Sequence, residues 1–174
     1  MVLTAAILAG GQSRRMGTDK AFVCIDGTPL VVRTAATIRA SGVPQVYTVG
    51  RQPDLVALSL PTITEVNQGR HPLFGIAAAL DALQDELVLF LPCDLVNLTP
   101  QHIQTLTVQQ GPCVASCNGV THPLFCILPK TLATTALDLA SAGKAAHCLI
   151  DGLPTVELPN PILVDANLPE QLPR

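Results

Sequence analysis

The sequence predicts an α/β fold, a three-layer α/β/α sandwich around a mostly parallel sheet. Apolar runs of strand length alternate along the chain with segments whose apolar residues recur at helical spacing. The strand-like runs are rich in Val, Ile and Leu instead of alternating in polarity, which is typical of strands covered on both faces. Asn118-Gly119 lies between two such runs and predicts a hairpin, so the sheet should be mixed. We expect residues 1–174 to form a single domain.

Composition limits the classes of partner. Apolar residues make up 48% of the chain and charged residues 13%, which excludes a disordered protein. The net charge of −3 leaves no broad basic surface, so neither nucleic acid nor a membrane is expected as a partner. The apolar run over residues 2–9 is too short to span a membrane and lacks the features of a signal peptide. We therefore expect a cytoplasmic protein.

The first elements follow from local signals. Residues 2–9 form an uninterrupted apolar run and are expected to be a buried strand. Asp26-Gly27 is a turn signal. Thr28-Pro29 suits the N-cap and first residue of a helix whose apolar spacing continues over residues 30–40, and Ser41-Gly42 should end it.

The middle of the chain repeats the alternation. Residues 45–49 and 61–64 are expected to be strands, with a short helix over 53–58 between them. Residues 73–83 form a very apolar helix, and residues 86–91 form a fully apolar strand.

The last third contains the hairpin. Residues 112–116 and 123–128 are its predicted strands. Apolar spacing and flanking prolines predict the remaining elements: helices over 100–108, 129–141 and 144–150, strands over 154–157 and 162–164, and a terminal helix that begins at residue 168.

Three sharp loops each follow a predicted strand, over residues 10–20, 65–72 and 92–94. The carboxyl ends of parallel strands lie at one edge of a sheet, and open α/β sheets bind their ligands outside that edge. We therefore expect the three loops to meet there and to form the binding site.

The first loop has the features of a phosphate-binding loop. Gly10 and Gly11 allow the backbone to approach an anion closely, and Arg14, Arg15 and Lys20 add cationic donors. The spacing fits neither the Gly-x4-Gly-Lys-Ser/Thr loop nor the Gly-x-Gly-x-x-Gly dinucleotide motif. The remaining alternative is a tight turn with solvated basic residues.

The third loop places Asp94 at the end of a buried strand. Mg²⁺ prefers one or two carboxylates together with phosphate oxygens, so Asp94 is the candidate metal ligand. Its alternative role is to cap the following turn.

The motif Leu8-Ala9-Gly10-Gly11-x-Ser13-x-Arg15-Met16-Gly17-x-Asp19-Lys20 resembles the signature of nucleotidyltransferases that activate sugar phosphates and pterins. Within that superfamily it is similar to the molybdenum cofactor guanylyltransferases, the MobA type. Further segments resemble that family's motifs, at residues 69–75, 91–94, 122–124 and 164–170. The resemblance implies the Rossmann-like fold of the nucleotide-diphospho-sugar transferases.

The same resemblance implies roles for individual residues. Arg15, Lys20 and Asp94 would be catalytic, with Asp94 as the ligand of Mg²⁺. The nucleotide would be bound by Leu8, Ala9, Gly10, Gly11, Lys20, Glu65 and Asp94. The acceptor would be bound by His122, Asp165 and Asn167. Glu65 replaces the family's usual Asp, and Asp165, which replaces an Asn, has an alternative role at the start of the terminal helix.

The implied reaction transfers GMP from GTP to molybdopterin or the molybdenum cofactor and releases pyrophosphate. Molybdoenzymes or other proteins of cofactor biosynthesis would be the partners. Three alternatives stay open: a related enzyme that uses CTP or another phosphorylated acceptor, a non-catalytic nucleotide-binding module, and a redox or metal protein that uses some of the six Cys.

Overall fold

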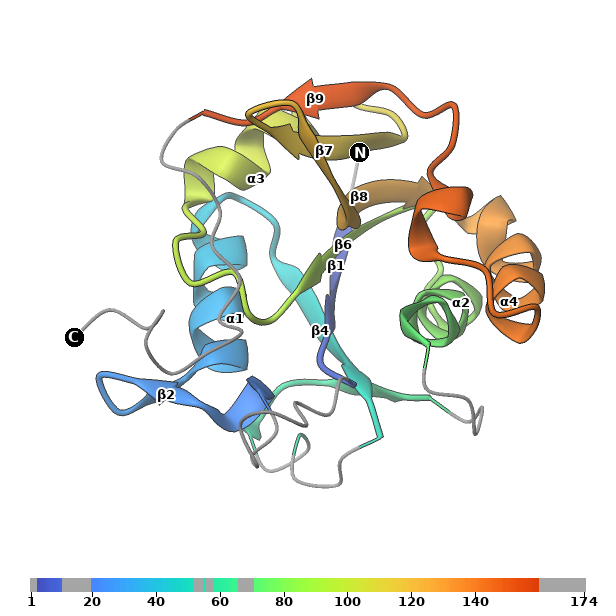
Figure 1. The fold of residues 1–174 in the computed structure, drawn as a ribbon. Helices are drawn as coiled ribbons and strands as arrows, with labels where there is room; N and C mark the ends of the chain where they lie inside the picture. The colour runs from blue at the N-terminus through green and yellow to red at the C-terminus, as the bar shows by residue number, and fades with distance from the viewer. Residues whose placement is uncertain (1–2, 11–19, 52–54, 56–57, 66–70, 160–174) are drawn as a thin grey trace.

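A computed structural model describes residues 3–10, 20–51, 55, 58–65 and 71–159. Its main sheet has seven strands in the order β5-β4-β1-β6-β8-β7-β9. The strands are β1 (Thr4–Leu8), β4 (Gln45–Gly50), β5 (Thr62–Thr64), β6 (Leu87–Pro92), β7 (Cys113–Cys117), β8 (Val120–Pro129) and β9 (Thr155–Glu157). Figure 1 shows β1 and β6 at the centre of the sheet.

Strand directions confirm a mostly parallel, mixed sheet. Strand β1 pairs in parallel with β4 and β6, and β4 pairs in parallel with β5. Strand β8 is antiparallel to both β6 and β7, while β9 is parallel to β7. Among the described strands, β8 therefore runs against the other six. The carboxyl ends of β1, β5 and β6 all lie at one edge.

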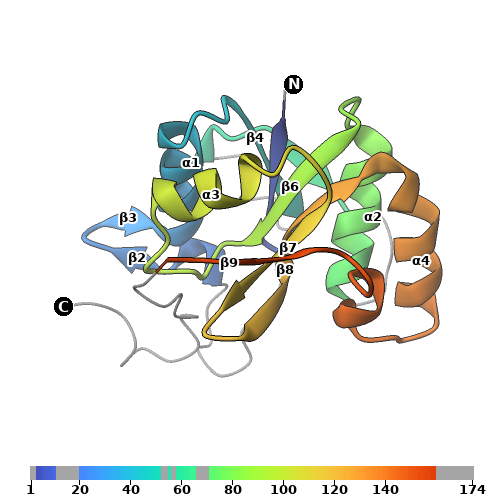
Figure 2. The same ribbon diagram turned by 90° about the horizontal axis from the view of Figure 1, so that it is seen from above.

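Helices cover both faces of the sheet. Helices α1 (Leu30–Ala40) and α3 (Pro100–Thr107) lie on one face, and α2 (Pro72–Ala82) and α4 (Ala133–Ser141) lie on the other (Figures 1 and 2). Strand β1 contributes Ile7 to the α1 side of the core and Ala6 to the α2 side. Because successive side chains of a strand point to opposite faces, both faces of β1 are apolar and buried.

Most predicted elements are confirmed with small changes at their ends, and one is wrong. Thr28-Pro29 does not start the first helix but forms strand β3 (Thr28–Pro29), which pairs with β2 (Cys24–Ile25). Asp26 and Gly27 have φ values of 51° and 74°, and two residues with positive φ make the tight turn of a two-residue hairpin. Helix α1 then begins at Leu30, with Pro29 as its extended N-cap.

Short 3₁₀ segments replace parts of the helices predicted near the carboxyl end. The predicted helix 129–141 consists of the 3₁₀ turn Lys130–Leu132 followed by α4, and only Ala146–Leu149 of the predicted helix 144–150 is 3₁₀. The predicted strand 162–164 and the terminal helix lie outside the described residues, as does most of the predicted helix 53–58.

Strand β8 contains an irregularity close to the carboxyl edge. Val114 of β7 pairs with Cys126, but the next residue, Ala115, pairs with His122, so residues 123–125 of β8 have no pairing partner in β7. Pro123 has no N–H to donate to a ladder, and prolines inside strands occur at such bulges. Pairing between β6 and β8 ends at Cys126. Beyond this point β8 pairs with β7 alone.

Candidate active site

Lys20 and Asp94 meet at the carboxyl edge of the sheet. Lys20 begins the 3₁₀ turn η1 (Lys20–Phe22), and Asp94 lies in the turn that follows β6. The Lys20 Nζ atom donates a hydrogen bond of 2.5 Å to Asp94 Oδ2. Their side chains are 20% and 13% exposed. The buried Thr34 of α1 donates its hydroxyl to the carbonyl oxygen of Cys93 at 3.3 Å, which ties the turn that carries Asp94 to the helix.

The Lys20–Asp94 pair offers one positive group, which could contact a triphosphate, and one negative group, which could contact the Mg²⁺ ion that accompanies it. An ammonium group at this edge can hold phosphate oxygens, and a single carboxylate suits Mg²⁺, which takes its remaining ligands from phosphate and water. The donor set around Asp94 therefore fits a magnesium ion that arrives with the nucleotide. Among the described residues, no cluster of three or more His, Cys, Asp or Glu could hold a metal on its own.

Glu65 and Arg51 form a second ion pair at the same edge. Glu65 directly follows β5 and Arg51 directly follows β4. Arg51 Nη2 donates to Glu65 Oε1 at 2.9 Å, and only 8% of the Glu65 side chain is exposed. Burial raises the pKa of Glu65, and the charge and hydrogen bond of Arg51 act in the opposite direction.

The Glu65 carboxylate also packs against the start of the first loop. A Cβ atom added to Gly10 would lie 3.2 Å from Glu65 Oε2 and 3.7 Å from the Cα of Gly50. Gly10 itself is exposed and follows the buried Ala9, whose N–H donates to the carbonyl oxygen of Val49 at 2.9 Å. The absence of a side chain at Gly10 therefore leaves room for the carboxylate of Glu65.

Replacing Gly10 by Ala should lower the melting temperature. Glu65 cannot move freely because Arg51 holds it, so the added methyl group is expected to lower the free energy of unfolding by about 1–3 kcal/mol. Each kcal/mol lowers the melting temperature of a chain of this size by about 2–4 °C. Thermal unfolding followed by circular dichroism measures the change. The Gly10→Ala/Glu65→Asp double variant has a shorter acid and should recover most of the loss. Gly111→Ala is the control, because its Cβ would meet nothing closer than 3.8 Å. An unchanged melting temperature in Gly10→Ala would contradict the close contact.

The hairpin of β7 and β8 brings His122 to the same end of the molecule. His122 is half-buried and lies next to the bulge, where β8 has left β6. The nearby Glu157 of β9 is exposed. Its pKa is lowered by the Ser116 hydroxyl, by the backbone N–H groups of the turn at Asn118-Gly119 and by His122, against the opposite effect of burial. Glu157 is also the register partner of Ser116, which places it beside β7 close to the hairpin turn.

Several predicted site residues lie together at strand ends, and the roles of all of them stay predictions. Within the described residues, Lys20 forms an ion pair with Asp94, and Glu65 lies beside Gly10. Leu8 ends β1, directly before Ala9. The remaining predicted site residues, Gly11, Arg15, Asp165 and Asn167, lie outside the described residues. Sequence reasoning missed Arg51 and Glu157, although the position of Arg51 directly after β4 follows the rule that identified the three loops.

The cysteines give no support to a metal or redox role. All six are free, and Cys93, Cys113, Cys117 and Cys126 are buried. Burial raises the pKa of both Cys113 and Cys126. Their thiols therefore stay protonated at neutral pH, whereas metal binding and disulfide exchange need the thiolate. Separately, no helix in the described ranges has the length and apolar character needed to cross a membrane.

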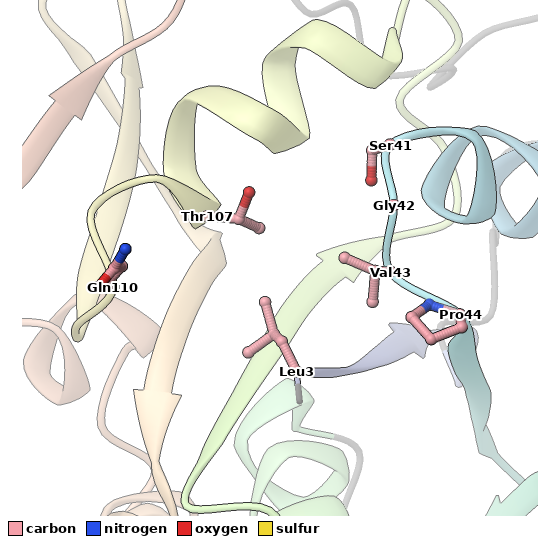
Figure 3. A pocket seen from close by; sticks show the side chains of 7 residues that line it. All are labelled: Leu3, Ser41, Gly42, Val43, Pro44, Thr107 and Gln110. Carbon is pink, nitrogen blue, oxygen red and sulfur yellow. The ribbon is translucent and has the colours of Figure 1, made fainter. Parts of the chain in front are cut away.

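A hollow of about 440 Å³ lies at the opposite, amino-terminal edge of the sheet (Figure 3). Figure 3 shows that Leu3, Val43 and Pro44 line it beside the ends of α1 and α3. The other lining residues are Ser41, Gly42, Thr107 and Gln110. None of these side chains is charged, so this hollow offers no group that could balance a triphosphate.

Comparison with known sequences shows similarity over most of the chain. Residues 5–156 match the family model described as the MobA-like NTP transferase domain. A Synechococcus elongatus protein named "probable molybdenum cofactor guanylyltransferase" is 38% identical over 157 residues, covering 83% of this chain and 80% of that protein. The molybdenum cofactor guanylyltransferase of Ectopseudomonas mendocina is 28% identical over 95% of this chain and 88% of its own length. A relative from Trichormus variabilis is 40% identical over 59% of this chain, but that alignment spans only half of the relative.

Solved structures confirm the fold class. A crystal structure of a protein from Aquifex aeolicus has a TM-score of 0.75 and 25% identity, and the match covers 90% of this chain and 86% of that one. The molybdopterin-guanine dinucleotide biosynthesis protein A of Archaeoglobus fulgidus has a TM-score of 0.71 and 19% identity, and the match covers 90% of this chain and 83% of that one. At this level of identity the second similarity concerns the fold alone.

Proposed function

This chain belongs to the family of MobA-like NTP transferase domains, and from that premise we propose that it transfers GMP from GTP to molybdopterin or to the molybdenum cofactor. The products are the guanine dinucleotide form of the cofactor and pyrophosphate. The observation that carries the proposal is the Lys20–Asp94 pair at the carboxyl edge of the sheet. The names of the relatives from Synechococcus elongatus and Ectopseudomonas mendocina support the choice of substrates.

The reaction joins two phosphates and needs no base. An oxygen of the acceptor's terminal phosphate attacks the α-phosphorus of GTP, and the bond from that phosphorus to the bridging oxygen of the β-phosphate breaks. Pyrophosphate leaves with the electron pair. The attacking phosphate is already an anion at neutral pH, so the protein's task is to position the two phosphates and to balance their charge. Lys20 is suited to this task, because its ammonium group can donate to phosphate oxygens as it now donates to Asp94.

Asp94 is the residue we assign to a magnesium ion, together with phosphate oxygens of the nucleotide. When bound, Mg²⁺ withdraws electron density from the phosphates and neutralises the charge of the leaving pyrophosphate. In the protein alone, Lys20 balances the carboxylate of Asp94. The charge of Asp94 is therefore kept in place and compensated before the metal and the nucleotide bind.

The choice of guanine as the base rests on the names of the relatives and not on the Lys20–Asp94 pair. A related enzyme that uses CTP, or one that uses another phosphorylated acceptor, would keep the same Lys20–Asp94 pair. The non-catalytic alternative is disfavoured because a module that only senses nucleotide has no need for a metal carboxylate, whereas Asp94 is present and paired. A cytoplasmic location and molybdoenzyme partners remain predictions from the family resemblance.

A nucleotide panel tests the function directly. The purified chain is incubated with Mg²⁺, molybdopterin and one of GTP, CTP, ATP or UTP, and pyrophosphate release is followed. We expect turnover with GTP to exceed that with the other nucleotides by at least about tenfold, a difference of about 1.4 kcal/mol in transition-state binding. Faster turnover of CTP would favour the alternative enzyme. Nucleotide binding without pyrophosphate release would favour the non-catalytic module.

A further inference from the structure

We propose that Arg51 is a positioning residue that keeps the carboxylate of Glu65 ionised and aimed at the nucleotide. The proposal rests on the function proposed above, because it takes Glu65 as a group that contacts GTP. Arg51 itself is assigned no contact with substrate, and it acts through Glu65.

The register of the sheet brings the two residues together. Strands β4 and β5 are parallel neighbours, and Gly50 pairs with Thr64 at their carboxyl ends. Arg51 and Glu65 are the next residues of the two strands, so their backbones leave the sheet side by side. The N–H of Glu65 also donates to the carbonyl oxygen of Gly50 at 3.2 Å. This hydrogen bond fixes the backbone of Glu65 next to that of Arg51.

One carboxylate oxygen of Glu65 is bonded to Arg51, and the other faces Gly10. Oε1 accepts from Arg51 Nη2 at 2.9 Å. Oε2 lies beside Gly10, at 3.2 Å from the position of an added Cβ. Gly10 starts the loop that we expect to hold the nucleotide. Arg51 therefore sets the orientation of the carboxylate relative to Gly10, and the absence of a side chain at Gly10 leaves room for it.

Charge is the second effect of Arg51. Only 8% of the Glu65 side chain is exposed, and burial disfavours the ionised form. An ionised carboxylate offers two acceptor oxygens to the N–H and O–H donors of a nucleoside, whereas the protonated group carries a donor of its own. The positive charge of Arg51 opposes the effect of burial on the pKa of Glu65. Removing Arg51 should therefore raise that pKa further and make nucleotide binding depend on pH.

Steady-state kinetics with GTP between pH 6 and pH 8 test the inference. We expect Arg51→Gln to raise the KM for GTP by about tenfold at pH 8, the effect of one weakened hydrogen bond to a charged group, with a smaller effect on kcat. The KM should rise further as the pH falls, because Glu65 becomes protonated. Arg51→Lys keeps the charge and should keep the flatter pH profile of the wild type.

Two further variants isolate the pair. Arg51→Gln/Glu65→Gln lacks the acid, so its KM should no longer rise as the pH falls. Arg33→Gln is the matched control, because Arg33 pairs with the exposed Asp26 at 3.7 Å on the surface. The inference is wrong if Arg51→Gln keeps the wild-type pH profile, or if the double variant retains the pH dependence of Arg51→Gln.

Ligand-free unfolding separates this inference from the proposed function. In Arg51→Gln the folded-state pKa of Glu65 lies further above its value in the unfolded chain, so the protonated form contributes stability that is lost as the pH rises through the folded-state pKa. The melting temperature of Arg51→Gln should therefore fall further below that of the wild type at pH 8 than at pH 5. In the double variant, the difference in melting temperature from the wild type should be the same at pH 8 as at pH 5.

The outcomes are distinguishable. If GTP does not bind but the melting-temperature difference of Arg51→Gln widens from pH 5 to pH 8, the proposed function fails and the Arg51–Glu65 coupling stands. If GTP is turned over but the widening is absent, the coupling fails alone.

Discussion

The Asp94→Asn variant should lose about 10³-fold or more of its rate of pyrophosphate release with GTP, molybdopterin and Mg²⁺. The amide keeps the size of the side chain and one acceptor oxygen but removes the negative charge that we assign to the metal. Loss of one well-placed electrostatic group costs about 10²–10³ in kcat, and loss of a metal ligand weakens both the charge balance and the position of the phosphates. The rate is measured at saturating GTP over a range of Mg²⁺ concentrations.

The fold of this variant should remain intact, because Asp94 belongs to a turn at the edge of the sheet and not to the apolar core. Circular dichroism and thermal unfolding check this. Asp26→Asn is the matched control, since it makes the same chemical change in an exposed turn whose positive φ an Asn accepts. Retention of more than a tenth of the wild-type rate by Asp94→Asn would remove Asp94 from the mechanism.

The Lys20→Met variant should lose about 10²–10³ of the transfer rate, again with the fold retained. Methionine keeps the length of the side chain and removes the ammonium group, so the phosphates lose a charge-assisted donor. Because Lys20 also donates to Asp94 at 2.5 Å, the carboxylate loses a neutralising partner as well. The two losses act on the same pair of phosphates, so the effects of Lys20→Met and Asp94→Asn should not add in the double variant.

Lys144→Met is the control, because Lys144 is exposed and follows α4, so it belongs neither to the first loop nor to the turn after β6. Its rate should match the wild type. If Lys20→Met transfers GMP at the wild-type rate while Asp94→Asn does not, the ion pair would be a structural contact of the free protein and Lys20 would have no part in the reaction.

Much of the architecture is predictable because its signals are local. The apolar run that contains β1 is buried on both faces, with Ile7 and Ala6 on opposite sides. The Asn118-Gly119 turn has φ values of 51° and 73°, as a two-residue hairpin needs. The loop at Gly10 and the turn at Asp94 could be assigned to one edge from the order of elements alone, because parallel strands end together.

The sequence could not predict the choice between competing local signals. Thr28-Pro29 has the features of a helix start, yet the positive-φ turn at Asp26-Gly27 folds it back onto β2. The irregular register of β8 was likewise hidden, because Pro123 shows where a strand is interrupted but not how many residues the interruption contains.

By itself the sequence determined the fold class, the edge of the sheet that carries the candidate site, and the presence there of Lys20, Glu65 and Asp94. Only the tertiary structure decided which charges face each other. Lys20 and Asp94 are 74 residues apart and meet because the 3₁₀ turn that begins at Lys20 lies beside the end of β6, and Arg51 meets Glu65 because Gly50 and Thr64 are register partners. Periodicity and turn chemistry act over a few residues, whereas contacts between distant side chains depend on strand order and register.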